Sequence, residues 1–447
     1  MRKPIPGIAF STIFVLLFYS VTSAQDSLSR PELKWDLATC LNYAARNNIQ
    51  VRTLEQSRLS SEQNLLLSKA ARYPNLNGTM SQTIVNSKST DPVVGGFQTQ
   101  ANFSSNYSLN SSVTLYNGGY LKNDIKQKDL QVQMSDLDIQ TALNDVTIQI
   151  TQAYLNILLA RENIVYLEDL LTTSQAQLTQ GKQRYDAGSI SRKDYIQFEG
   201  LVATDQFNLV TARNAYRQNI ITLKQLLQLN SSVNFDVVVP DTLYMNPVIT
   251  PLPDAAARAL SIRPEVMADS LNIMAAELEL EKSKAGRRPL ISLSGALSTG
   301  YSDNRDEAYF PQLNNNFFQR AGLSMSIPIF QNRINKTNIE LSKIQIEQAK
   351  LTLLGTKTTL DQAVEQAYIA LLNARNQYSV AELQLRVSQQ TLDITNEQLK
   401  LGAVNMVDLL TQKNLYVQAL QNYIQARYSA ILNHKVYDFY TGVPVSL

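Results

Sequence analysis

Residues 119–181 read GYLKNDIKQKDLQVQMSDLDIQTALNDVTIQITQAYLNILLARENIVYLEDLLTTSQAQLTQG. The stretch has no glycine or proline between its ends, and its apolar residues recur at helical spacing, so we predict one uninterrupted helix. At about 1.5 Å per residue, roughly 65 helical residues extend about 100 Å, whereas helices of globular proteins usually have about 8 to 20 residues. A function for this chain must therefore account for very long helices.

The same scheme returns later in the chain. Between Pro328 and Gly402 only Gly355 interrupts a second helical stretch. Matching residues lie 215 positions apart in the first helix and 214 positions apart in the long helices and beyond, as in the pairs Ser68/Ser283, Lys69/Lys284, Tyr154/Tyr368, Arg161/Arg375, Gly188/Gly402 and Asp194/Asp408. The near-constant offset predicts an internal duplication in which each half reads helix, strand, strand, long helix, helix.

The predicted organisation is a signal peptide, two repeats and a connector. Arg2 and Lys3 precede an apolar run, and Thr22-Ser23-Ala24 offers small residues for cleavage before Gln25, which is typical of a secretory signal peptide. We assign residues 1–24 to this peptide, 25–229 to the first repeat, 230–253 to the connector and 254–447 to the second repeat.

Each repeat is divided in the same way. The first has a helix from residue 36 to about 72, a strand hairpin at 74–116, a long helix at 119–185 and a helix at 189–229. The second has a helix, a hairpin at 289–330, a long helix at 331–401 and a helix at 403–440. Because the turns after the long helices are short, we expect each long helix to run antiparallel to the helix that follows it.

Apolar and polar side chains alternate in both predicted hairpins. One face of the first hairpin carries Phe103, Ser105, Tyr107, Leu109, Ser111, Val113 and Leu115, and in the second hairpin every other residue from Phe317 to Ile329 shares a face. The loops are expected at Asp91-Pro92 with Gly95-Gly96, and at 303–316. Such strands fit either a closed sheet with one face in lipid or a soluble hairpin with one face on a core.

The signal peptide and the aromatic residues near the strand ends favour the membrane. Four strands in each chain are too few for a closed barrel, since the smallest single-chain membrane barrels have about eight. Several chains must therefore pool their strands. Both hairpins turn on the same side, so the helices leave the sheet on the other side and continue the barrel as a helical tube.

The composition leaves little room for other functions. The chain has 40 basic and 38 acidic residues and a net charge of +2, which gives no footprint for nucleic acid. A single cysteine, Cys40, cannot form a disulfide within the chain, and a single histidine, His434, cannot build a histidine-based metal site. We predict no enzyme activity, no metal and no cofactor, and we expect His434 to pack between helices.

Three segments together resemble the outer-membrane efflux protein family, the TolC-like exit ducts. The run 36–48 (DLATCLNYAARNN) is similar to the first-helix pattern of that family, and the run 257–266 (ARALSIRPEV) is similar to its duplicate. The run 401–410 (LGAVNMVDLL) resembles the second helix-turn tip. The resemblance covers nearly all of the chain after the signal peptide.

The resemblance implies an α/β membrane protein. It would be a trimeric outer-membrane β-barrel of 12 strands, with 4 strands from each chain, continued by a long antiparallel α-helical barrel across the periplasm. It would pass substrates outward from a periplasmic adaptor and an inner-membrane pump, in an efflux or type I secretion system. The tips that contact the adaptor would be Gly188, Ser189 and Ile190 in the first repeat, and Gly402, Ala403 and Val404 in the second.

The resemblance also implies a constriction at the second tip. Asp408 matches the first acidic ring of the family, whereas Thr411 stands where a second acidic residue can occur and Val404 stands where some relatives carry arginine. Three carboxylates around one axis would attract cations and repel one another. The alternative is a solvated aspartate at the start of a helix, favoured by the helix dipole.

Two other classes of protein share some of these features. A soluble periplasmic coiled-coil scaffold or adaptor would keep the signal peptide and the long helices, but it would tolerate charged substitutions at Leu109 or Met325, which would then lie on a solvent face. A secreted enzyme is disfavoured because the sequence has no Ser-His pairing, P-loop or zinc spacing. The sequence leaves open which cargo, adaptor and pump belong to the chain.

Overall fold

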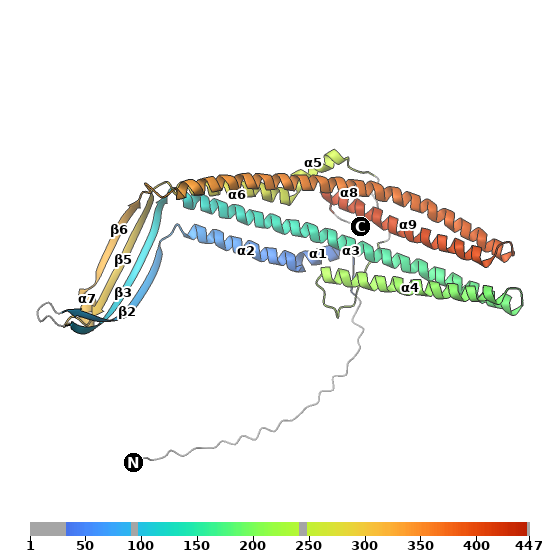
Figure 1. Ribbon diagram of the computed structural model, residues 1–447, viewed down its shortest axis with the longest axis horizontal. Helices are drawn as coiled ribbons and strands as arrows, with labels where there is room; N and C mark the ends of the chain where they lie inside the picture. The colour runs from blue at the N-terminus through green and yellow to red at the C-terminus, as the bar shows by residue number, and fades with distance from the viewer. Residues whose placement is uncertain (1–32, 91–96, 241–247, 445–447) are drawn as a thin grey trace, which may run out of the picture.

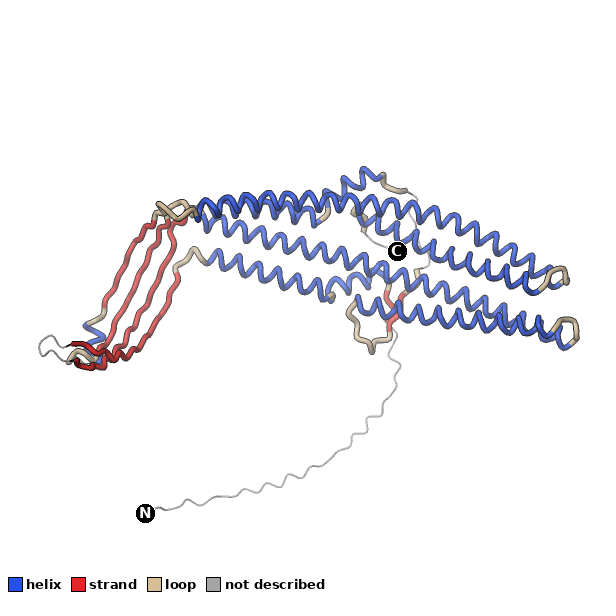
Figure 2. Tube along the Cα trace, viewed as in Figure 1, coloured by secondary structure: helices blue, strands red, loops and turns tan. Residues whose placement is uncertain are grey.

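The computed structural model describes residues 33–90, 97–240 and 248–444. It is an elongated molecule with a β-sheet at one end and two helix-turn-helix tips at the other (Figure 1). The predicted signal peptide at 1–24 and the predicted turn residues Asp91-Pro92 and Gly95-Gly96 lie outside the described residues. The long helices all lie beyond one end of the sheet, as the positions of the hairpin turns predict, whereas a short helix at Tyr309–Asn315 lies at the other end (Figure 2).

The helices form two series of equal lengths. The first consists of α1 (Leu37–Asn47, 11 residues), α2 (Ile49–Ala70, 22), α3 (Tyr120–Asp186, 67) and α4 (Arg192–Leu226, 35). The second consists of α5 (Leu252–Ile262, 11), α6 (Pro264–Ala285, 22), α8 (Ile334–Lys400, 67) and α9 (Met406–Tyr440, 35). At about 1.5 Å per residue, α3 and α8 each extend about 100 Å.

The predicted continuous helix at 36–72 is wrong, because Asn48 divides it. The backbone of Asn48 is extended (φ −63°, ψ 128°), and its side-chain oxygen accepts hydrogen bonds from the backbone N–H of Gln50 (2.9 Å) and Val51 (3.3 Å). These bonds satisfy the free donors at the start of α2. In the second series Arg263 occupies the corresponding break, and Pro264 opens α6, where its missing N–H costs nothing.

The four long strands form one antiparallel sheet in the order β2-β3-β5-β6. Their bounds are β2 Asn75–Thr90, β3 Phe97–Asn117, β5 Leu290–Ser302 and β6 Phe318–Ser326. Leu109 pairs with Gly78 and Leu297, and Leu297 pairs with Gln319, so the predicted apolar positions of all four strands share one face. The opposite face is mostly serine, asparagine and threonine.

Four local features differ from the prediction or were missed. A bulge between Thr114 and Tyr116 places Tyr116, rather than Leu115, opposite Ile291. Strand β6 ends at Ser326, so Ile327 and Ile329 lie beyond the sheet. A short helix, α7 (Tyr309–Asn315), lies in the predicted loop 303–316. In the predicted connector, β4 (Phe235–Val237) pairs in parallel with β1 (Leu33–Trp35).

The main core lies about halfway along the helices, where α3 meets α1, α9 and the β1-β4 ladder. Tyr154 is buried there, and its hydroxyl donates to the backbone oxygen of Val238 at 2.5 Å. Its counterpart in α8, Tyr368, contacts Tyr437 of α9 with ring centroids 5.6 Å apart. The repeated Gln-Ala-Tyr segments thus place an aromatic ring in or against a hydrophobic cluster of each half.

Among the described helices, none combines the length and the apolar composition needed to cross a membrane.

His434 is buried in α9, in agreement with its predicted packing role. Burial lowers its pKa below 6.5, and Lys435 and Arg375 act in the same direction, whereas Asp438, whose Oδ2 lies 3.4 Å from Nε2, opposes the shift. The folded state therefore takes up this proton less readily than the unfolded state, which titrates near pH 6.5.

We expect stability to be constant above pH 6.5 and to fall as the pH decreases below it, by up to about 1.4 kcal/mol per pH unit in each chain. Urea unfolding of the detergent-solubilised protein at pH 7.5, 6.5 and 5.5 would measure this dependence. In the His434→Leu variant the loss between pH 6.5 and 5.5 should disappear, because the chain has no other histidine. An unchanged pH dependence in the variant would contradict the assignment.

Candidate functional site

Both tips end their long helix with glycine in the left-handed region. At the first tip Gly188 has φ 72°, its N–H donates to the oxygen of Tyr185 (2.9 Å), and the next N–H, of Ser189, donates to Arg184 (2.8 Å). At the second tip Gly402 has φ 75°. Its N–H donates to the oxygen of Leu399 (3.1 Å), and the N–H of Ala403 donates to the oxygen of Gln398 (2.8 Å). Glycine is favoured at such helix ends because it has no Cβ.

The helix after each tip begins with a capping box. Ser191 caps α4 and Asn405 caps α9, and in each box the aspartate three residues later returns a bond to the backbone N–H of the cap. These bonds are 3.3 Å long from Ser191 to Asp194 and 3.2 Å long from Asn405 to Asp408. The two aspartates thus cap the starts of their helices in the same way, and the helix dipole stabilises both negative charges.

The six predicted tip residues lie together at the end of the molecule. Gly188, Ser189, Gly402 and Ala403 are exposed, whereas Ile190 and Val404 are half-buried. Ile190 packs against a cluster that joins the two tips, formed by Phe198, Leu201, Met406 and Leu409. Gly181 permits the close approach of α3 and α4 here, because a Cβ at this position would lie 2.6 Å from the ring of Phe198.

Asp408 and Thr411 lie one turn apart on α9, and both are exposed. The hydroxyl of Thr411 donates to the backbone oxygen of Val407 at 2.8 Å. Among the residues that the structure describes, the carboxylate of Asp408 accepts a hydrogen bond from the backbone N–H of its own cap, Asn405, and the residue is otherwise exposed.

Sequence reasoning missed a buried ion pair that ties the two helical hairpins together. Lys413 of α9 lies 2.6 Å from Asp205 of α4, and both side chains are only 4% exposed. The hydroxyl of Ser174 in α3 accepts a hydrogen bond from Lys413 and donates one to Asp205. Burial lowers the pKa of Lys413 and the carboxylate of Asp205 opposes that shift. One sequence signal was available, since Asp205 interrupts the apolar stripe of Phe198, Leu201, Leu209 and Ala212.

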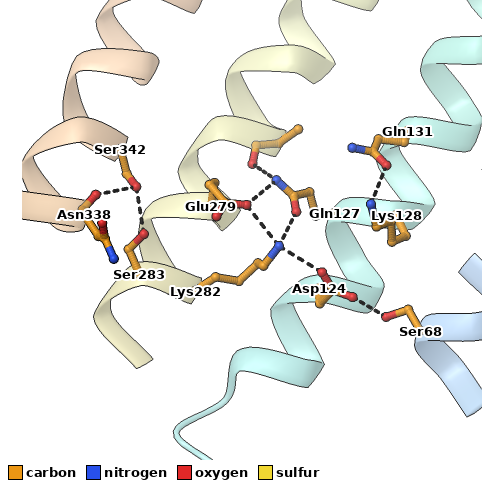
Figure 3. A network of polar contacts seen from close by, with 11 residues as sticks. Ser68, Asp124, Gln127, Lys128, Gln131, Glu279, Lys282, Ser283, Asn338 and Ser342 are labelled. Carbon is orange, nitrogen blue, oxygen red and sulfur yellow. Dashed lines mark hydrogen bonds and ion pairs between the residues drawn. The ribbon is translucent and has the colours of Figure 1, made fainter. Parts of the chain in front are cut away.

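A second polar network (Figure 3) crosses the helices near the ends that adjoin the strands. Lys282 of α6 lies 2.9 Å from Asp124 of α3 and donates to Gln127 at 2.8 Å, and Asp124 accepts a bond from Ser68 of α2 at 2.5 Å. On the other side of α6, the hydroxyls of Ser283 and Ser342 lie 2.8 Å apart. The network therefore connects α2, α3, α6 and α8 in one row.

A sheet with one apolar and one polar face, joined end-on to a row of very long helices, defines the class of channel proteins that cross the outer membrane and extend into the periplasm. The chain belongs to the outer membrane efflux protein family, whose sequence profile matches residues 40–228 and 255–434.

Three relatives show how far the likeness extends. The outer membrane efflux protein BepC of Brucella suis is 22% identical over 435 residues, which cover 94% of this chain and 86% of BepC. The structure of CusC has a TM-score of 0.78 with 20% identity and covers 92% of this chain and 94% of CusC. The structure of the CmeC channel of Campylobacter jejuni has a TM-score of 0.75 with 17% identity, and the match covers 91% of this chain and 86% of CmeC.

Family membership settles the class of function. The protein is an outer-membrane efflux channel that extends into the periplasm, and it acts as an exit duct. The alternative of a soluble periplasmic scaffold or adaptor is therefore set aside. The predicted roles of the individual tip residues are a separate matter, because family membership does not assign them.

Proposed function

We propose that three copies of the chain close into a duct whose barrel has 12 strands, 4 from each copy. The observation that carries this proposal is the sheet, which has one largely apolar face with many exposed side chains and two free edges, β2 and β6. The apolar face includes Leu76, Met80, Ile84, Leu109, Leu297, Leu323 and Met325, all of which are exposed in the single chain. In lipid, a sheet is stable only when its edges pair.

The helical row supports the same closure. Near the sheet, α2 packs on α3, α3 on α6 and α6 on α8, so α2 and α8 stand at the ends of the row. These ends continue the free strands β2 and β6. The equal helix lengths and constant offsets of the two series also support a gene duplication, which would make the closed tube six similar helical units around one axis.

We further propose that Asp408 narrows the duct at the tips. Three copies would bring three exposed carboxylates together around the axis, with Thr411 one turn deeper. Such a ring attracts cations and repels anions. The exposed turn residues Gly188, Ser189, Gly402 and Ala403, with Ile190 and Val404 beside them, would receive a periplasmic adaptor that couples the duct to an inner-membrane pump.

Single-channel recording in planar bilayers tests the ring. We expect the native protein to conduct with a preference for cations, and the Asp408→Asn variant to lose most of that preference. Asp194→Asn is the matched control, because Asp194 occupies the same capping-box position in the other tip, so its replacement also weakens a cap. Equal effects of both substitutions would overturn the ring and leave the duct.

A further inference from the structure

The polar face of the sheet carries a single charged side chain. Within their described bounds, strands β2, β3, β5 and β6 contain no aspartate or glutamate, and their basic side chains are Lys88 of β2 and Arg320 of β6. Lys88 lies on the apolar face, because it is an even number of positions from Met80 in an unbroken strand. Arg320 lies on the polar face, because it pairs with Ala296, the neighbour of Leu297.

Arg320 stands in a row of neutral residues. The pairing of the strands places Ala296, Asn110 and Asn77 in line with it across the sheet. The side chain is exposed, and among the residues that the structure describes no carboxylate forms an ion pair with it. Its guanidinium is therefore open to a ligand from solution.

Closure of the proposed barrel does not bring a carboxylate to Arg320. In the trimer, β6 of one copy would pair with β2 of the next, and β2 has no acidic residue in any register. The acidic residues Asp303, Asp306 and Glu307 lie beyond the end of β5, and Asp303 already accepts a hydrogen bond from the backbone N–H of Phe103 at 2.8 Å. The guanidinium thus keeps its charge uncompensated in the assembled barrel.

Three copies would place three such guanidinium groups around one axis. Rotational symmetry keeps equivalent residues at the same height. Twelve strands spaced about 4.8 Å apart and tilted by about 40° form a wall about 12 Å from the axis. A side chain that points inward from this wall brings its charge within the Debye length of about 8 Å at physiological salt. The field of the three charges therefore reaches the centre of the lumen.

The chemistry of the guanidinium selects the ligand. It presents N–H donors in a planar fork that matches two oxygens of a phosphate, sulfate or carboxylate group. We infer that three Arg320 side chains, one from each copy, form a ring that binds one multivalent oxyanion inside the barrel. The inference rests on the proposed trimeric barrel and adds to it an anion site, opposite in sign to the proposed Asp408 ring at the other end of the duct.

Calorimetry and native mass spectrometry of the full-length protein in detergent test the Arg320 ring, with inorganic tripolyphosphate as the probe at low salt. We expect one tripolyphosphate for every three chains, because a ligand on the axis is shared. Arg320→Gln should lower the affinity by about tenfold or more, and Arg320→Lys, which keeps the charge without the fork, should lower it less. Lys88→Gln is the matched control, because it removes the same charge from the other face of the sheet and should leave the affinity unchanged.

The outcomes separate the anion site from the barrel. Adenosine triphosphate carries the same group on a larger body, so its Arg320-dependent binding would assign the ring to molecules in transit, whereas binding of tripolyphosphate alone would assign it to free anions. Native trimers that bind neither probe, or an unchanged affinity in Arg320→Gln, would overturn the Arg320 ring and leave the barrel intact. Loss of binding in Lys88→Gln but not in Arg320→Gln would mean that the faces of the barrel are reversed. A native protein that is monomeric in every detergent would overturn the proposed trimer itself.

Discussion

Replacing Lys413 by alanine is expected to loosen the two helical hairpins near the tips by about 3 to 5 kcal/mol. The substitution leaves the carboxylate of Asp205 buried without its cation, and such an uncompensated charge is strongly unfavourable. Because the substitution acts on one contact between the two hairpins, a local measurement reports on it more directly than a melting temperature does. Hydrogen exchange of the α4 amides around Asp205 should accelerate by about two to four powers of ten.

Two controls separate the buried charge from other effects. Lys413→Met combined with Asp205→Leu removes both charges and keeps the volume, so exchange should return to within about tenfold of the native rate or become slower. Lys400→Ala breaks an ion pair with Glu397 of similar length, 2.7 Å, but both of its side chains are more than half exposed, and its effect should stay below about 1 kcal/mol. Native exchange rates in Lys413→Ala would show that the pair contributes nothing.

The long helices and the sheet could be predicted because their patterns extend over many residues. Across α3, no glycine or proline falls between Gly119 and Gly181, so neither backbone entropy nor a missing donor favours a break. In the strands, a one-residue slip would move every apolar side chain to the other face, so the alternation fixes the register. The structure pairs Leu109 with Leu297 as that alternation requires.

Features decided by one or two residues were harder to predict. The break at Asn48 depends on a side chain that caps a helix within an otherwise helical pattern, and β1 and β4 have three residues each, too few to show a period. The bulge after Thr114 depends on how β3 meets β5, which no local pattern records. At Asn48 one local cap outweighs the helical pattern around it, whereas the short strands and the bulge depend on tertiary contacts.

The structure of the tips could be predicted in part from the sequence. Gly188 and Gly402 mark the helix ends because only a residue without a Cβ adopts the left-handed turn easily. The capping box from Asn405 to Asp408 has a recognisable spacing, yet the same aspartate fits either a helix cap or a constriction of a channel. The partnership of Lys413 with Asp205 could not be read, because the two residues are 208 positions apart and meet only when the hairpins pack.

Replacing Leu109 by arginine is expected to destabilise the protein in lipid by about 2 to 4 kcal/mol per chain. Leu109 lies near the middle of β3, on the exposed apolar face and opposite Leu297. If that face contacts the hydrocarbon, the guanidinium loses its hydration unless it reaches the interface. Guanidinium titration of the protein refolded in phosphatidylcholine vesicles would measure the change in the free energy of unfolding.

The neighbouring residue supplies the control. Asn110 follows Leu109 in β3, so it lies at about the same depth but on the opposite face of the sheet. That face already carries an arginine, because Asn110 pairs with Ala296 of β5 and Ala296 pairs with Arg320 of β6. Asn110→Arg should therefore change the free energy of unfolding by less than about 1 kcal/mol, because its charge meets water inside the duct. A large cost for Leu109→Arg with a small cost for Asn110→Arg fixes the lipid side of the sheet. Equal costs would mean that both faces are wet, and a larger cost at Asn110 would mean that the barrel is closed with its faces reversed.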